Sequence, residues 1–356
     1  MKKRGVYLDN LPLEKAENIL IKTLDENGFF SDKKYEMVDV RDALGRITAV
    51  PVFARISSPH YHAAAMDGIA VSAKDTYGAD EKNPVRLKEG VHFHYVDTGD
   101  PIPSGCDTVI MIEEVHPVSE GEVEIIKSYS PWENVRGIGE DIVATELIVP
   151  ENHRLRPQDL AAILSGGHTE IAVRRKPRVA VIPTGTELVM PGEDLKPGDI
   201  IESNSAMLAG MAKEWGAEAC VLDKVIDDYE MIKNRLQEAL KKADVVIINA
   251  GSSAGSEDYT SSIISELGTL LVHGVAIRPG KPVIMGIVEG KPVIGIPGYP
   301  VSAALTMKLF VKPLIYRMQD IPMPSAEKVN AVMSRRVVSH IGIEEFLRVK
   351  LGRIGD

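Results

Sequence analysis

The spacing of hydrophobic residues divides the chain into stretches of different type. Leu13–Leu24 has apolar residues three and four positions apart, which predicts an amphipathic helix, and Val38–Ala49 predicts a short helix after a strand-like start. Between Val50 and Leu147 the pattern changes to short runs rich in β-branched residues, separated by Gly, Pro and Asp. This stretch predicts an all-β region. Its expected strands are Val52–Ile56, Ile69–Val71, Val85–Leu87, Thr108–Ile112 and Val123–Ile126.

From Arg178 onward, buried strands alternate with helices, which predicts a parallel or mostly parallel sheet. The polar run Val149–Leu155 marks a boundary before this region. Helices are expected to begin near Pro157, at Ser203 or Asn204, and at Asp228. The expected strands are Val179–Ile182, Ala217–Leu222, Ala243–Ile248, Val272–Ile277 and Val293–Ile296.

Beyond Ile321 the pattern predicts three further short strands, Val329–Val332, Arg336–Ser339 and Glu345–Val349. Three short strands rarely close a core of their own. We therefore expect the sequence to be part of a longer protein.

Length and charge narrow the possible classes. A chain of 356 residues is expected to form roughly two to four domains. Its net charge of −10 disfavours a nucleic-acid-binding protein. Two isolated cysteines, the lack of a signal-peptide core and the lack of a run of about 18 apolar residues predict a cytoplasmic protein without a membrane segment.

Three Gly- or Ser-rich turns follow expected strands, at Asn249–Asp258, Arg278–Pro282 and Pro297–Pro300. Backbone N–H groups and helix N-termini in such turns favour anions. The cations of Arg278 and Lys281 and the carboxylates of Glu257 and Asp258 add the side chains of a phosphate-plus-metal site. For any single loop, tight-turn formation alone remains an alternative.

Candidate carboxylates lie in or beside turns far apart in the sequence, and Glu187 directly follows a buried strand, where α/β sheets present ligand groups. Mg²⁺ bound to phosphate needs about one or two carboxylates, so some of them are structural or orient a substrate. The set comprises Asp67, Asp141, Glu187, Asp227 and Asp258.

Three other kinds of site are disfavoured. Thr184-Gly185-Thr186 lacks the Gly-Lys-Ser/Thr ending of a P-loop, and no Gly-x-Ser-x-Gly nucleophile elbow occurs. The pairs His60/His62 and His92/His94 are interpreted as solvated strand faces, not as metal ligands.

These motifs resemble the MoeA family of molybdopterin molybdenumtransferases, which is also seen as the E domain of gephyrin. The resemblance covers nearly the whole chain, in the family's order. The stretches that carry it are Ser58–Val71, Thr98–Val109, Glu113-Glu114, Asn134–Asp141, Pro183–Leu188, Ile201–Asn204, Gly255–Tyr259, Arg278–Pro282 and Pro297–Ala303.

The resemblance implies an α/β plus β multidomain chain that forms an elongated homodimer. Residues 1–49 and 148–176 would form a helical domain, 50–147 a β-rich domain, 177–321 a molybdopterin-binding-like three-layer α/β domain, and 322–356 part of a C-terminal β domain. The active site would lie between the α/β domain of one subunit and the β-rich domain of the other.

The implied reaction is the Mg²⁺-dependent insertion of molybdate, or tungstate, into adenylylated molybdopterin with release of AMP. A molybdopterin adenylyltransferase and acceptor molybdoenzymes are the implied partners. By family position, the catalytic residues would be Asp67, Thr98, Asp141, Glu187 and Asp258, with Glu187 and Asp258 at the metal. The substrate-binding residues would be Gly251, Ser252, Ser253, Asp227, Arg278, Lys281, Gly298, Pro300 and Ser302.

The chain departs from the family pattern at several positions. Ala250–Ser253 replaces Gly-Gly-Val-Ser, Arg278 replaces Lys, Gly274 replaces a basic residue and Tyr299 replaces Asn. These departures resemble a MoeA subgroup with an extra periplasmic-binding-like C-terminal domain. They leave open a non-catalytic cofactor-binding or oxyanion-sensing protein, and more weakly a scaffold that grips partner peptides.

Overall fold

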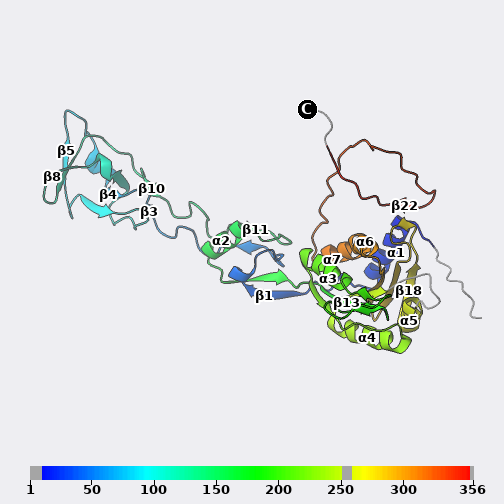
Figure 1. Cartoon of the computed structure of the whole chain (residues 1–356). Helices are drawn as coiled ribbons and strands as arrows, with labels where there is room; N and C mark the ends of the chain where they lie inside the picture. Colours follow the sequence, from blue (N-terminus) through cyan, green and yellow to red (C-terminus); the bar gives the residue numbers. More distant parts are fainter. Residues whose placement is uncertain (1–9, 251–258, 353–356) are drawn as a thin grey trace, which may run out of the picture. The chain divides into compact units, whose positions relative to one another are not determined.

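The computed structural model describes residues 10–250 and 259–352. The chain forms two compact units, one of residues Met37–Val173 and one of Met1–Glu36 with Arg174–Asp356. Figure 1 shows the course of the chain through both. Because β1 (Tyr35–Asp39) pairs with β12 (Glu170–Arg174), the two passages between the units form one two-stranded sheet.

The unit that contains residues 174–356 has a six-stranded sheet in the order β16-β13-β17-β21-β20-β18. The first four strands are mutually parallel, whereas β20 and β18 run antiparallel to their neighbours. This confirms the expected mostly parallel sheet. The strands are β13 (Arg178–Thr184), β16 (Glu218–Val221), β17 (Val245–Ala250), β18 (Gly268–His273), β20 (Ile284–Val288) and β21 (Lys291–Pro297).

Helices cover both faces of this sheet, so the unit has three layers (Figure 1). Val179 and Val181 of β13 belong to a core with α1, α3 and the α6–α7 region, whereas Ala180 and Ile182 face a second core with α4 and α5. Burial on both faces explains the continuous apolar runs of the strands. The helices are α1 (Leu13–Glu26), α3 (Asn204–Glu214), α4 (Tyr229–Lys242), α5 (Tyr259–Leu267), α6 (Pro300–Thr306), the π-helical η4 (Met307–Val311) and α7 (Lys312–Met318).

The unit of residues 37–173 has two three-stranded sheets, β6-β4-β7 and β5-β9-β8, which share one hydrophobic core around Ile69, Phe93 and Val123. Their strands are β4 (Gly68–Val71), β5 (Val85–Lys88), β6 (Phe93–Val96), β7 (Thr108–Met111), β8 (His116–Ser119) and β9 (Glu122–Ile125). These strands confirm the expected all-β stretch.

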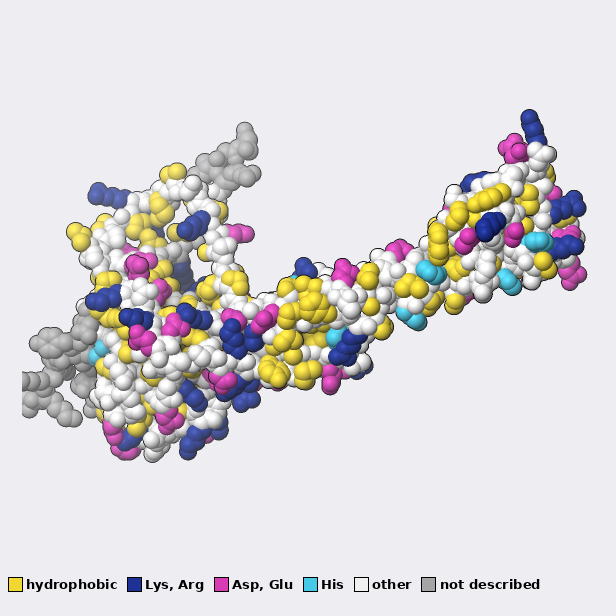
Figure 2. Space-filling view, turned by 180° about the vertical axis from the view of Figure 1, so that it is seen from behind, with side chains coloured by type: hydrophobic (Ala, Val, Ile, Leu, Met, Phe, Trp, Pro, Cys, Tyr) yellow, Lys and Arg dark blue, Asp and Glu magenta, His cyan; other side chains and the backbone are white. Residues whose placement is uncertain are grey.

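A separate core in the same unit packs α2 (Pro157–Ser165) against β11 (Leu147–Val149) and β2 (Val52–Phe53). Phe53 and Leu147 lie opposite each other in that strand pair, and they are 51% and 47% exposed. Figure 2 shows hydrophobic side chains on the surface of this unit. The remaining short elements are β3 (Ala63–Ala64), β10 (Val135–Arg136), η1 (Val40–Asp42), η2 (Ala73–Thr76) and η3 (Ile112–Glu114).

Three sequence predictions were wrong in detail. The helix expected in Val38–Ala49 is reduced to the three-residue 3-10 turn η1, and the strand expected at Val272–Ile277 is split into β18 and the short β19 (Ile277–Arg278). Of the strands expected after Ile321, the described residues contain only β22 (Glu344–Glu345), which pairs with β19. A local pattern can predict a strand, but it does not provide the neighbouring strand with which that strand must pair. In this segment Val332 and Val338 are 98% and 75% exposed, so they are not packed against a core.

The structure also shows where α1 packs. Leu20 and Leu24 lie in the core of the α/β unit with Leu208 and Phe310, whereas Ile163 of α2 packs in the other unit. The division into four domains remains a prediction, since the described chain separates only into two compact units.

Candidate functional site

A cavity of about 510 Å³ lies where β13, β17 and β21 end, at the carboxyl edge of the parallel part of the sheet. This is the edge at which open α/β sheets bind ligands. The cavity is lined by Thr184, Glu187, Leu188, Ile200, Ile201, Glu202, Ser203, Asn204, Asp227, Asn249, Gly298, Tyr299 and Pro300.

The turn after β13 positions Glu187. The Gly185 N–H donates to the carbonyl oxygen of Val225 at 3.0 Å, and Gly185 has φ +152. A Cβ atom at this glycine would lie 2.9 Å from Glu187 Oε2 and Leu188 Cγ, so a larger residue would displace the carboxylate. The pair β14 (Leu188–Val189) and β15 (Ile200–Ile201) extends the turn, and Ile200 N–H donates to Glu187 O at 2.8 Å.

Asp227 is tied to the same turn by reciprocal contacts. The Thr186 N–H donates to Asp227 Oδ2 at 3.3 Å, and the Asp227 N–H donates to Thr186 Oγ1 at 3.3 Å. The structure therefore brings together Glu187 and Asp227, which are 40 positions apart in sequence and both line the cavity.

The N-terminus of α3 forms another wall. Glu202 Oε1 accepts a hydrogen bond from the Ser205 N–H at 2.9 Å, which satisfies one of the free donors at the start of the helix. Asn204 Nδ2 donates to the carbonyl oxygen of Gly298 at 2.6 Å. This bond joins α3 to the loop after β21 and fixes the position of Gly298.

Asn249 lies near the end of the central strand β17 and is 4% exposed. Its Oδ1 is buried and has no hydrogen-bond partner. Buried polar atoms are nearly always paired, so an unpartnered one beside a cavity needs an explanation. Asn249 begins one of the turns predicted to bind an anion, and Glu202 and Asn204 lie in a stretch that carries the family resemblance, but none of the three was predicted as a site residue. The signal available for Asn249 was a polar residue at the end of a run of buried Val and Ile.

The predicted cations do not line this cavity. Its described lining contains Glu187, Glu202 and Asp227 but no Lys, Arg or His. Arg278 lies on β19, where its Nη1 is 3.6 Å from Glu345 Oε1, and Lys281 is exposed in the following turn.

The remaining predicted substrate residues divide between the cavity and other places. Gly298 and Pro300 line the cavity, whereas Ser302 is buried in α6 and is not part of the lining. Gly251, Ser252, Ser253 and Asp258 lie outside the described residues, as does Glu257.

Two further predicted groups lie in the unit of residues 37–173. Asp67 Oδ1 accepts hydrogen bonds from Thr98 Oγ1 at 2.7 Å and from the Thr98 N–H at 2.6 Å, and these bonds lower the pKa of Asp67. Asp141 accepts two hydrogen bonds from Arg136 Nη2, at 2.8 and 2.9 Å. Local donors thus position both carboxylates, and the bonds from Thr98 favour the charged form of Asp67.

Of the two expected metal ligands, Glu187 lies within the described residues and Asp258 does not. Within the described residues, no group of three or more His, Cys, Asp or Glu side chains forms a metal site. Glu187 and Asp227 share the cavity, and Mg²⁺ bound to phosphate needs only about one or two carboxylates beside water. The donor set is therefore compatible with such an ion.

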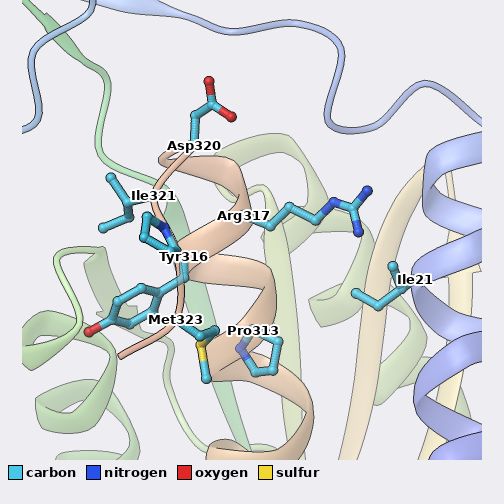
Figure 3. A pocket seen from close by; sticks show the side chains of 8 residues that line it. Ile21, Pro313, Tyr316, Arg317, Asp320, Ile321 and Met323 are labelled. Carbon is cyan, nitrogen blue, oxygen red and sulfur yellow. The ribbon is translucent and has the colours of Figure 1, made fainter. Parts of the chain in front are cut away.

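A second hollow of about 460 Å³ lies between α1 and α7 and the segment after α7 (Figure 3). Arg317 points from α7 toward α1 and makes two bonds of 2.7 Å to the carboxylate of Asp25. Asp320 pairs with Lys33 and, at 3.5 Å, with Arg174. These ion pairs connect segments of the same unit. No predicted site residue lines the hollow.

No helix in the described parts of the chain combines the length and the apolar character needed to cross a membrane.

Two family models match the chain. Residues 11–167 match the MoeA N-terminal region (domain I and II), and residues 180–317 match a probable molybdopterin binding domain.

Individual proteins resemble the chain over most of its length. A putative molybdopterin biosynthesis protein of Methanocaldococcus jannaschii is 36% identical, over 96% of this chain and 87% of its own length. Molybdopterin molybdenumtransferase 2 of Mycobacterium tuberculosis is 31% identical, over 88% of this chain and 82% of its own. A crystal structure of the molybdopterin biosynthesis MoeA protein from Pyrococcus horikoshii has a TM-score of 0.71 and 30% identity, over 88% of this chain and 80% of that one.

Proposed function

Because the chain belongs to the MoeA family of molybdenum cofactor biosynthesis proteins, we propose that it is a molybdopterin molybdenumtransferase that inserts molybdate or tungstate into adenylylated molybdopterin and releases AMP. The observation that carries the proposal is the cavity at the carboxyl edge of the sheet, where Glu187 and Asp227 face the same space. Family membership indicates the class of reaction, and the cavity is the site at which we propose that the reaction occurs.

In this proposal the described chain contributes a preformed binding site with fixed carboxylates. The Thr186–Asp227 contacts and the Gly185 turn hold Glu187 and Asp227 before substrate arrives, which reduces the cost of ordering them. Mg²⁺, when bound, would offset negative charge on the phosphates as AMP leaves. Glu187, with Asp227 beside it, would hold the ion from this unit, and Asp258 is the further ligand that the family position implies.

Asp67, Thr98 and Asp141 are proposed as catalytic groups contributed by the unit of residues 37–173. Their support is that each carboxylate is positioned by defined donors, Thr98 for Asp67 and Arg136 for Asp141. We further propose a cytoplasmic homodimer that receives its substrate from a molybdopterin adenylyltransferase and delivers its product to acceptor molybdoenzymes. The exposed apolar pair Phe53 and Leu147 supports a self-association surface.

One observation favours a second candidate, a cofactor-binding or oxyanion-sensing protein without turnover. Arg278, the predicted anion ligand, is already close to Glu345, and Gly274 stands where a basic residue is usual. A protein that binds the pterin but engages the anion weakly would show this arrangement.

Single-turnover release of AMP from adenylylated molybdopterin separates the two candidates. The transferase should release AMP only when both Mg²⁺ and molybdate are present, and Asp258→Ala and Glu187→Gln should each slow release by about 100-fold or more. Glu230→Gln, an exposed carboxylate in the first turn of α4, is the matched control and should leave the rate unchanged. Pterin binding without any AMP release in the unaltered protein would reject the transferase in favour of the second candidate.

A further inference from the structure

The segment that carries β22 is attached to the α/β unit at one place. Among the described residues after α7, β22 is the only helix or strand, and it pairs in parallel with β19 (Figure 1). On either side of it, Ile341 is fully exposed and Leu347 is 53% exposed. A segment held by so few buried contacts can open locally without unfolding the rest of the unit.

Phe346 anchors this segment. Its N–H donates a hydrogen bond to Arg278 O, and its side chain packs, partly buried, against the core that contains Ile277. A second backbone bond runs from the Glu344 N–H to Ala276 O. Truncation of the Phe346 ring should therefore weaken the attachment more than truncation of an exposed neighbour, because only the ring buries apolar surface.

The docked segment occupies the guanidinium of Arg278. The register pairs Glu345 with Arg278, and paired residues of neighbouring strands project to the same face. The Glu345 side chain is 9% exposed, and its Oε1 lies 3.6 Å from Arg278 Nη1 and 2.9 Å from His340 Nδ1. The carboxylate thus takes the place of an oxyanion beside the guanidinium. An oxyanion brought to the same group would be repelled by it.

Glu17 of α1 destabilises the docked position. Burial, and then the negative charge of Glu344, raise the pKa of Glu17 above its usual value. The two carboxylates therefore disfavour each other when both are charged. Docking is thus opposed as well as favoured, and a ligand that binds only the open form can shift such a balance.

We propose that residues 342–346 form an autoinhibitory strap that docks on β19 and prevents Arg278 from binding the oxyanion substrate. The proposal rests on the proposed function, since it takes Arg278 as an oxyanion ligand. Docking of the strap and binding of the oxyanion exclude each other. Release of the strap therefore raises the affinity for the oxyanion, and the oxyanion releases the strap by the same factor, because linkage is reciprocal.

The test measures both directions in the full chain. Hydrogen exchange followed by mass spectrometry reports the opening of peptides that contain the Glu344 and Phe346 amides, with molybdate as the ligand and chloride at equal ionic strength as the control. Calorimetric titration gives the dissociation constant of molybdate for the unaltered protein and for Phe346→Ala. Leu347→Ala, at the exposed neighbouring position, is the matched control variant.

We expect Phe346→Ala to bind molybdate about two- to five-fold more tightly than the unaltered protein, because more molecules present a free Arg278. Saturating molybdate should speed exchange of the Glu344 and Phe346 amides by the same factor, and chloride should not. Leu347→Ala should bind molybdate like the unaltered protein. Glu17→Gln, which removes the repulsion with Glu344, should bind it more weakly.

Unchanged exchange of these amides at saturating molybdate would overturn the proposal. So would equal affinities of Phe346→Ala and Leu347→Ala, or the lack of molybdate binding by all of these proteins. If Phe346→Ala does not fold, the exchange experiment on the unaltered protein decides. Release of the strap by molybdate in a protein that does not release AMP would keep this inference and reject the transferase, whereas AMP release with an unresponsive strap would do the reverse.

Discussion

Arg278 Nη1 lies 3.6 Å from Glu345 Oε1, and His340 Nδ1 lies 2.9 Å from the same carboxylate oxygen. Backbone bonds between β19 and β22 support the contact, because the Glu344 N–H donates to Ala276 O and the Phe346 N–H donates to Arg278 O, each at 2.8 Å. A cation predicted to bind substrate anion is therefore paired with a carboxylate of its own chain.

Glu345→Gln should strengthen molybdate binding at Arg278 by about two- to five-fold, a modest factor because the guanidinium is largely exposed. The hydrogen bond with His340 lowers the pKa of Glu345, burial opposes this and Arg278 lowers it further, so the carboxylate stays charged through the usual range of Glu. In the unaltered protein the same gain should appear only when the pH falls below that range. Calorimetric titration with molybdate measures the affinity of Glu345→Gln and the pH dependence of the affinity of the unaltered protein, with Glu344→Gln as the control.

Asp159→Asn should lower the free energy of unfolding by about 1–3 kcal/mol at pH 7. The carboxylate is 6% exposed and accepts from the Arg156 N–H at 2.8 Å, from the Arg156 guanidinium and, at 2.7 Å, from His153 Nε2. The Arg156 side-chain bond is the main reason why its pKa lies well below the usual range.

Since a depressed pKa stabilises the fold above the unfolded-state pKa, the difference between Asp159→Asn and the unaltered protein should be full at pH 7. It should shrink as the pH falls below about 4. Urea unfolding at several pH values measures it, and a pH-independent difference would contradict the explanation.

Gly185→Ala should reduce AMP release by about ten-fold or more, since small misplacements of positioned groups are costly. The new Cβ would collide with the Glu187 carboxylate and Leu188, at a backbone conformation with φ +152. Gly210→Ala in α3 is the control, because a Cβ there meets nothing within 4 Å and should stabilise the helix slightly. Equal activity of the two variants would show that the Gly185 turn does not position Glu187.

Thr98→Val should raise the pKa of Asp67 toward the usual value for Asp, because the Thr98 hydroxyl is the larger of the two hydrogen-bond contributions that lower it. Thr98→Ser retains the hydroxyl and should retain the low pKa. Carboxyl ¹³C NMR titration of the two variants measures the shift. An unchanged pKa in Thr98→Val would mean that the Thr98 N–H bond alone holds the charge.

Phe53→Glu should shift the protein toward monomer if the exposed Phe53–Leu147 pair forms part of a dimer surface, since a charge there would be desolvated on association. Tyr77→Glu, at another exposed aromatic residue in the same unit, is the control. Sedimentation equilibrium gives the oligomeric state, and dimers of equal stability in both variants would place the interface elsewhere.

Local sequence determined most individual elements. The runs of Val and Ile that became β13 and β17 are apolar because both of their faces are buried, and Asp228 begins α4 by accepting from the Met231 N–H at 2.9 Å. Such features depend on neighbours within a few residues, so they can be predicted without a fold. Their places in or beside turns made Glu187 and Asp227 candidates, the resemblance to a family implied their roles, and the structure places both at one cavity.

Only the tertiary structure decided which distant groups meet. No local pattern indicates that α1 packs on the α/β sheet, that Glu345 pairs with Arg278, or that the Asn249 oxygen is buried without a partner. The strands expected after Ile321 failed for the same reason, because a strand needs hydrogen-bonding neighbours from elsewhere in the chain. Periodicity along a sequence encodes the preferred local conformation and the buried face of an element, whereas the partner of that face depends on how all the elements pack together.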